Sequence, residues 1–180
     1  KTFKKMFDEG LIYRGNRIVN YCTKHGTSFS DLEVVYEDRK TPLYYIKYGP
    51  LTLATVRLET KFGDTAVAVH PGDKRYQKYI GKQIDIETVL GKAKIKVIAD
   101  EAVDPDFGTG VIKVTPAHAP IDFGIGQRHN LEIRQVIGFD GRLNEKAGKF
   151  SGMKVKEARQ AIAYEMEERG LIEKIDYEYQ

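Results

Sequence analysis

The sequence predicts an α+β domain that is rich in β-structure and similar to a β-barrel, with a few short helices. Short runs rich in Val, Ile, Tyr and Thr recur along the chain, and glycine, proline and aspartate separate them. Helical periodicity is confined to a few segments, so alternating βαβ units are not expected. A length of 180 residues fits one domain, in which 1–32 and 171–180 are expected to connect to a larger chain.

The expected helices are few and short. Phe3, Met6 and Phe7 share one helical face near the start of the chain, and Gly10 is a typical stop. Further helices are predicted over 73–79, where an aspartate can cap the first turn, and over 122–129, after a proline. The strongest helical pattern covers 155–169, where apolar residues recur on one face and a glycine follows.

The expected strands alternate apolar and polar residues or form short apolar runs between turn residues. Extended chain is predicted over 11–21, 33–36, 43–48, 51–56, 65–70, 84–89, 94–99, 111–114, 131–139 and 171–179.

Composition excludes several classes of protein. The single cysteine, Cys22, rules out an intrachain disulfide and a closed cysteine-rich zinc site. Cys22 and His25 have the spacing of half a zinc site, but no second pair follows, so no metal or cofactor is expected. No apolar run is long enough to cross a membrane and no secretory signal begins the chain, which favours a reducing cytoplasm.

Charge is unevenly distributed, although the net charge is only +3. The stretch 74–96 contains seven basic and two acidic residues, whereas 157–180 contains three basic and seven acidic residues. Two interpretations stay open: both are solvated faces, or the basic stretch contacts a phosphate backbone.

The segment 108–123 contains the most informative group of polar residues. Lys113 and Thr115 are two apart in a predicted strand and therefore share one of its faces. His118 and Asp122 follow where the chain leaves that strand for a helix, which is a frequent place for functional side chains. A purely structural role, with Asp122 as a helix cap and His118 as a satisfied loop residue, is the alternative.

The segment 55–65 contains a second group. Arg57, Glu59 and Asp64 occur beside the hydroxyl groups of Thr55 and Thr60. Such a combination can hold a phosphate, a ribose or a carboxylate, because guanidinium and hydroxyl groups donate to these oxygens. An ion-paired loop between strands is the alternative.

Together these segments resemble the editing domain that is inserted in valyl-, isoleucyl- and leucyl-tRNA synthetases. The resemblance includes Thr55–Thr65, Gly63-Asp-Thr-Ala-Val-Ala-Val-His-Pro71, Gly108–Phe123 and Ile125–Leu131, and it covers nearly the whole chain. The order Arg57-x-Glu59-Thr60 and the run Lys113-Val-Thr-Pro-Ala-His118 are most similar to the valyl pattern.

The resemblance implies hydrolysis of a mischarged threonyl ester on the 3′ end of a valine-specific tRNA, by a positioned water. It implies that the catalytic residues are Lys113, Thr115 and Asp122. Asp122 would hold the α-ammonium, and Lys113 and Thr115 would line the pocket near the ester. Substrate-binding roles are implied for Thr55, Arg57, Glu59, Thr60, Phe62, His118, Ala119 and Phe123. Expected partners are the tRNA and the rest of a synthetase chain, and no synthetic-site motifs for ATP are found.

Several residues depart from the family pattern. Ala119 stands where the family usually has a second aspartate, and Val56, Leu58, Lys61 and Phe62 also differ from it. The loss of that carboxylate leaves open a module that binds the tRNA 3′ end with weakened or lost deacylase activity. A separate alternative is an isoleucyl-type domain that clears valine.

Overall fold

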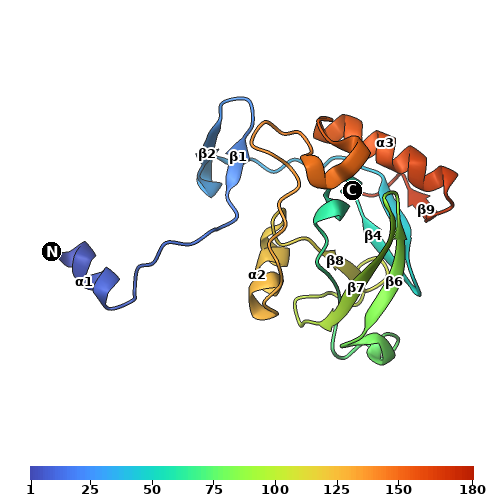
Figure 1. The fold of residues 1–180 in the computed structure, drawn as a ribbon, viewed down its shortest axis with the longest axis horizontal. Helices are drawn as coiled ribbons and strands as arrows, with labels where there is room; N and C mark the ends of the chain where they lie inside the picture. Colours follow the sequence, from blue (N-terminus) through green and yellow to red (C-terminus); the bar gives the residue numbers. More distant parts are fainter.

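The computed structural model describes all residues, 1–180, as three small sheets, three α-helices and four 3₁₀-helices (Figure 1). The α-helices are α1 (Thr2–Asp8), α2 (Pro120–Arg128) and α3 (Val155–Glu168). The 3₁₀-helices are η1 (Asp31–Glu33), η2 (Leu58–Gly63), η3 (Gln77–Tyr79) and η4 (Glu145–Phe150). The strands are β1 (Asn20–Cys22), β2 (Thr27–Phe29), β3 (Leu43–Tyr48), β4 (Leu51–Thr55), β5 (Ala66–Val69), β6 (Gln83–Thr88), β7 (Gly91–Ala99), β8 (Val111–Val114) and β9 (Ile172–Asp176).

Two sheets form the body of the fold. The strand order β4-β3-β9 is antiparallel throughout, and the order β6-β7-β5-β8 contains one parallel pair, β5 with β7. Strand β8 runs antiparallel to β5, with Lys113 opposite Val67 and Val114 opposite Ala66. The third sheet is the small hairpin β1-β2. The α+β, β-rich class is confirmed, but the sheets are open and no closed barrel forms.

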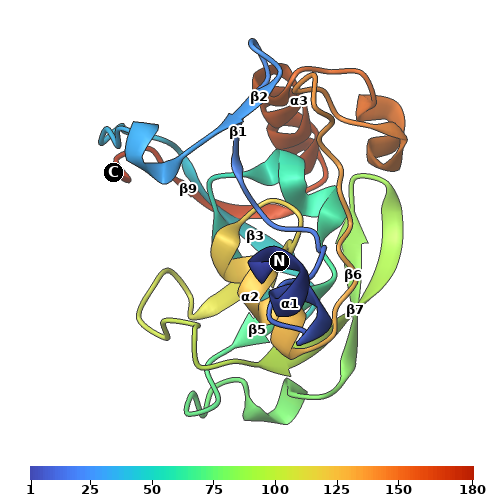
Figure 2. The same ribbon diagram turned by 90° about the vertical axis from the view of Figure 1, so that its left-hand side faces the viewer.

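The main hydrophobic core lies between the two larger sheets and α3. Its buried residues come from β3, β4, β5, β6 and β7 and from the apolar face of α3, where Ala158, Ile162 and Met166 point inward. A smaller core beneath α2 contains Ala66, Val114 and Ile125. Figure 2 shows α2 and α3 at different ends of the sheets.

Most predicted elements are present, within one to three residues of the expected ends, but of the extended chain predicted over 11–21 only the last two residues belong to a strand, β1. The strands predicted over 33–36 and 131–139 are wrong, as is the full helix over 73–79. At 33–36, Ser30 and Glu33 form a capping box that produces η1, and Val35 and Tyr36 are exposed without a partner strand. Residues 131–139 form only a single bridge, between Ile137 and Leu143.

Near 73–79 only η3 is helical. The Asp73 carboxylate accepts from the Arg75 backbone N–H and pairs with the Arg75 guanidinium, so its oxygens are engaged in a local turn instead of a helix cap. An Asx-type contact of this kind competes with helix formation.

The two ends of the chain differ. No residue before Leu43 is buried, and α1 lies away from the sheets at the end of an extended segment (Figure 1). The C-terminal segment, in contrast, supplies β9, which pairs with β3, and Leu171 is buried. Residues 171–176 are therefore part of the folded body and not only a connection. No helix has the length and apolar character needed to span a membrane.

Candidate functional site

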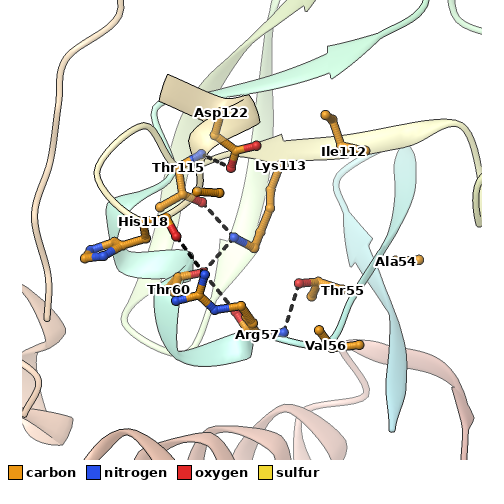
Figure 3. Close-up of a pocket in the computed structure, with 11 residues that line it drawn as sticks. Ala54, Thr55, Val56, Arg57, Thr60, Ile112, Lys113, Thr115, His118 and Asp122 are labelled. Carbon is orange, nitrogen blue, oxygen red and sulfur yellow. Dashed lines mark hydrogen bonds between the residues drawn. The ribbon is translucent and has the colours of Figure 1, made fainter. Parts of the chain in front are cut away.

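A cavity of about 150 Å³ lies where β4 ends, η2 passes and β8 leads into α2 (Figure 3). We call it the first cavity. It is lined by Ala54, Thr55, Val56, Arg57, Thr60, Ile112, Lys113, Thr115, His118, Ala119 and Asp122. Eight of the eleven residues to which a site role was assigned from the sequence lie around it.

Lys113 is held from two sides within this cavity. Its Nζ donates to Thr60 Oγ1 and to Thr115 Oγ1, both at 2.7 Å (Figure 3). Lys113 lies in β8 and Thr115 is the residue after its end, and their side chains meet as their spacing predicts, while η2 brings Thr60 across to them. An ammonium has three donors, so two hydrogen bonds leave one N–H for another acceptor.

A buried carboxylate lies behind Lys113. Asp64 Oδ1 accepts from Thr115 Oγ1 at 2.8 Å and lies 3.6 Å from Lys113 Nζ, and its Oδ2 accepts from the Tyr48 hydroxyl at 2.5 Å. The Asp64 side chain is 2% exposed. The burial of Tyr48 and the nearby negative charge of Asp64 raise the pKa of this phenol well above its usual value. Asp64 therefore compensates the lysine charge from outside the cavity lining.

Asp122 lies in the first turn of α2 and closes the opposite side. Its Oδ2 accepts from the Thr115 backbone N–H at 2.8 Å. Burial raises the pKa of Asp122, although the Thr115 hydrogen bond and the Lys113 charge act in the other direction. No hydrogen bond from within the chain is made to Oδ1. Ala119 is the N-cap of the same helix and supplies no side-chain cap.

Arg57 forms the more open edge of the first cavity. Its Nη1 donates to the His118 carbonyl oxygen at 2.7 Å, and its backbone N–H donates to Thr55 Oγ1 at 3.1 Å. Thr60 Oγ1 donates to the Arg57 carbonyl at 3.0 Å, which fixes the start of η2. The Arg57 side chain is 41% exposed, so part of its guanidinium is open to a ligand.

The His118 imidazole points away from Lys113 (Figure 3). Its Nε2 accepts from the Val136 backbone N–H at 2.9 Å. Burial, together with the charges of Arg57 and Lys113, lowers the pKa of His118 to about 4, so the ring is neutral near pH 7. His118 therefore lines the cavity chiefly through its backbone, and its ring holds the 131–139 segment in place.

Three residues with an expected substrate-binding role lie elsewhere. Glu59 is fully buried, and its two oxygens accept from Arg159 of α3 at 2.8 Å each, which ties η2 to that helix. Phe62 packs on Phe150, with ring centres 5.8 Å apart. Phe123 lines a different cavity, beside the N-terminal segment. Successive residues of a 3₁₀-helix point in different directions, so η2 cannot turn Glu59, Thr60 and Phe62 to one side.

Sequence reasoning assigned no site role to four residues around the first cavity. Ala54, Val56 and Ile112 form part of its wall, and Asp64 lies behind it. Asp64 occurs in the same threonine-rich segment as Arg57. Its position near threonine hydroxyls and an arginine was the feature of the sequence that could have identified it as part of the site.

The Cys22 and His25 pair lies far along the chain from this site. Cys22 Sγ and His25 Nδ1 are 3.3 Å apart, and no third His, Cys, Asp or Glu joins them. A tetrahedral zinc site needs four ligands.

The arrangement suits a small substrate that has both a positive group and a polarised carbonyl. Asp122 offers a carboxylate oxygen, and Lys113 offers a donor on the other side of the same small space. The Thr115 hydroxyl lies between them but is nearly sealed, with the residue only 1% exposed, and it already bonds to Lys113 and Asp64. The hydroxyl is therefore unsuited to attack a substrate directly.

Comparison with known proteins gives a consistent result. The family model described as class I tRNA synthetases (I, L, M and V) matches residues 1–165. The chain is 47% identical to a valine–tRNA ligase of Lactobacillus johnsonii and 49% identical to one of Fervidobacterium nodosum, in each case over 98% of this chain. A valine–tRNA ligase of Thermotoga maritima is 46% identical over the same share. The chain spans about a fifth of the length of these relatives.

Proposed function

Because the chain belongs to the class I tRNA synthetases of the I, L, M and V group, we propose that it is the editing domain of a valyl-type enzyme. Its first cavity would hydrolyse the ester of a threonine wrongly attached to valine-specific tRNA. The observation that carries this proposal is the convergence of Lys113 and Asp122, of opposite charge, on one cavity of about 150 Å³.

The need for such a site follows from the likeness of threonine and valine. A valine pocket rejects threonine by only about 100-fold, a figure known for this enzyme family, because the two side chains have nearly the same shape. A second site that admits the hydroxyl can remove the error. Polar groups that surround a small cavity, as Thr60, Thr115 and Lys113 do here, favour a hydroxyl-bearing side chain over an apolar one.

The substrate ester would fit the charges of the first cavity in only one orientation. Asp122 Oδ1 would accept from the α-ammonium of the amino acid, since a charge-assisted hydrogen bond is short and strong. The remaining N–H of Lys113 would donate to the ester carbonyl oxygen. Arg57, at the open edge, would hold the ribose or the phosphate of the terminal nucleotide.

Water would be the nucleophile. Its oxygen attacks the ester carbonyl carbon, and the oxygen of that carbonyl becomes an oxyanion that Lys113 stabilises. Collapse of this intermediate breaks the bond to the ribose oxygen, which takes up a proton. The products are a free amino acid and a deacylated tRNA.

The partners of the domain would be the 3′ end of a tRNA and the remaining four fifths of a synthetase chain. A single strand of RNA fits the small net charge of +3, because the domain would receive only the end of the molecule.

The test compares ester loss from threonyl- and valyl-tRNA specific for valine, using the wild-type chain and Asp122→Asn. We expect rapid loss of the threonyl ester, sparing of the valyl ester, and a strong rise in KM for Asp122→Asn. Asp106→Asn, in the exposed loop before β8, is the matched control and should behave as wild type.

Three results would contradict the proposal. Binding of the tRNA end without turnover would assign the chain to a module that has lost its deacylase activity, for which Ala119 is the visible cause. Hydrolysis of the valyl ester would assign it to the isoleucyl type. Equal rates for wild type and Asp122→Asn would remove the first cavity from the reaction.

A further inference from the structure

A second cavity, of about 280 Å³, lies on the other side of η2. Thr60 of η2 lines the first cavity, whereas Lys61 and Phe62 line the second, and the two cavities share no lining residue. We call the second one the basic cavity. The basic cavity is thus distinct from the ester site, although Asp64 in its lining also accepts from Thr115 Oγ1 of the first cavity.

Five basic side chains from different parts of the chain converge on the basic cavity. They are Lys61 of η2, Lys92 and Lys94 of β7, Lys146 of η4, and Arg134 of the segment after α2. The only acidic residue in the lining is Asp64, whose oxygens already accept from hydroxyl groups.

Two of these five cations have carboxylate partners. Arg134 pairs with Glu132 at 2.6 Å, and Lys94 lies 3.6 Å from Asp85 in an exposed pair. Lys61, Lys92 and Lys146 have no ion-pair partner, and Lys146 Nζ donates to the Gln135 carbonyl oxygen at 3.3 Å. The cavity therefore keeps an excess of positive charge after every partner is counted.

Lys61 is the most unusual of the five. Its Nζ is sealed from solvent, has no hydrogen-bond partner, and lies 4.0 Å from the centre of the Tyr48 ring. Burial lowers the pKa of Lys61 to about 7, a direction that Lys113 reinforces and Asp64 opposes. A buried donor without a hydrogen-bond partner is rare in folded proteins, and here the Tyr48 ring is the contact made by the amine.

The remaining lining is mostly apolar and includes two aromatic rings. Tyr48, Phe62, Ile86, Val89, Leu90, Ala93, Ile95 and Ile162 contribute to it. A cavity with an apolar wall and a positive border fits a ligand that joins a flat, weakly polar group to a phosphate.

We propose that the basic cavity binds a nucleotide, with its phosphate among Lys61, Lys92 and Lys146 and its base against the apolar wall. Inside a low-dielectric cavity, one phosphate charge interacts strongly with the Lys61 amine even without direct contact. Binding would favour the charged form of that amine, so the ligand would bring a proton with it near neutral pH.

The experiment measures binding by calorimetry with the whole 180-residue chain and four probes: inorganic phosphate, AMP, adenosine, and an RNA dinucleotide with one phosphodiester. We expect saturable binding of AMP, of the dinucleotide, or of both, at least tenfold tighter than that of adenosine. Binding of AMP alone would indicate a free nucleotide, and binding of the dinucleotide would indicate an RNA chain. Phosphate alone should bind weakly, because it lacks the base.

Two lysine variants locate the site. Lys61→Met should weaken binding at least tenfold, whereas Lys78→Met should leave it unchanged. Lys78 is the matched control, since its Nζ also lies over a tyrosine ring, 4.9 Å from the centre of Tyr79, but outside the basic cavity.

Proton uptake gives a readout specific to Lys61. Calorimetry of the dinucleotide at pH 7.5 in two buffers of different ionisation enthalpy should show uptake of roughly half a proton in wild type and none in Lys61→Met. The phosphodiester does not titrate near this pH, so the proton can be assigned to the protein.

The proposal would be overturned if neither AMP nor the dinucleotide bound more tightly than adenosine. Equal binding by wild type and Lys61→Met would do the same. Neither result would depend on ester hydrolysis, and Lys113→Ala should retain nucleotide binding in the basic cavity even though it is expected to lose deacylation.

Discussion

Two lysines, Lys61 of η2 and Lys113 of β8, show two ways of placing an amine inside a protein. Lys113 Nζ donates to two threonine hydroxyls and lies 3.6 Å from Asp64. Lys61 Nζ has no hydrogen-bond partner, and burial lowers its pKa to about 7. The chain therefore supplies hydrogen-bond acceptors for the Lys113 amine but places the Lys61 amine against an aromatic ring.

Replacing each lysine by methionine tests this contrast most strongly. Lys113→Met should lower kcat for threonyl-tRNA hydrolysis by roughly 100- to 1,000-fold, the typical cost of losing one oxyanion donor. Lys61→Met should retain kcat within about threefold, because it contacts no substrate group in the first cavity. Single-turnover deacylation rates measure both. A comparable loss in the two variants would abolish the distinction between the cavities.

A substitution of Asp64 is the next test, because its carboxylate balances the charge of Lys113 from outside the first cavity. Asp64→Asn should lower the free energy of unfolding by about 3 kcal/mol, since it leaves a buried lysine without its counter-charge. Urea unfolding measures the effect. Asp85→Asn is the control, because its pair with Lys94 is exposed and should contribute under about 1 kcal/mol. Equal effects would mean that the burial of Asp64 is energetically unimportant.

The difference in stability between wild type and Lys61→Met should depend on pH. Folding lowers the pKa of Lys61 from 10.5 to about 7, so the unfolded chain binds the extra proton between these values. Wild-type stability therefore rises with pH over that window. Below pH 7 the variant avoids a buried charge and should be the more stable of the two proteins. That advantage should shrink steadily as the pH approaches 10.5, and a constant difference would contradict the assignment.

Ala119 allows a smaller change at the first cavity. Ala119→Asp should stabilise the chain by about 1 kcal/mol, because a carboxylate at the N-cap of α2 accepts from the free N–H groups of the first turn. It should also favour hydrolysis of threonyl over other esters.

Ala119→Asn serves as the matched variant for this prediction. Asparagine caps the helix without adding charge, so it should raise stability to a similar extent with less effect on selectivity. Thermal unfolding and relative deacylation rates separate the two effects. Unchanged selectivity in Ala119→Asp would remove position 119 from amino-acid recognition.

The sequence predicted the parts of the site that depend on local spacing. Lys113 and Thr115 are two residues apart in a strand, and Asp122 follows at the start of a helix, so their proximity follows from strand and helix geometry. The strands 43–48 and 111–114 were predicted for the same reason, because their patterns are short and regular.

What the sequence could not predict depends on distant partners. Glu59 pairs with Arg159, a hundred residues later, and this contact withdraws it from the first cavity. Residues 131–139 have the composition of a strand, but the Val136 N–H bonds to the His118 ring instead of to a neighbouring strand. The sequence likewise predicted a β-rich, barrel-like set of strands but could not show whether the sheets close, because the pairing of strands is a property of the whole fold.

The most direct test of the central claim is a structure of the chain with a non-hydrolysable amide analogue of threonyl-adenosine. We predict that the ammonium of the threonyl group lies within hydrogen-bonding distance of Asp122, with its carbonyl oxygen on Lys113 Nζ and its hydroxyl near Thr115. Placement of the threonyl group outside the first cavity, or with its ammonium away from Asp122, would contradict the claim.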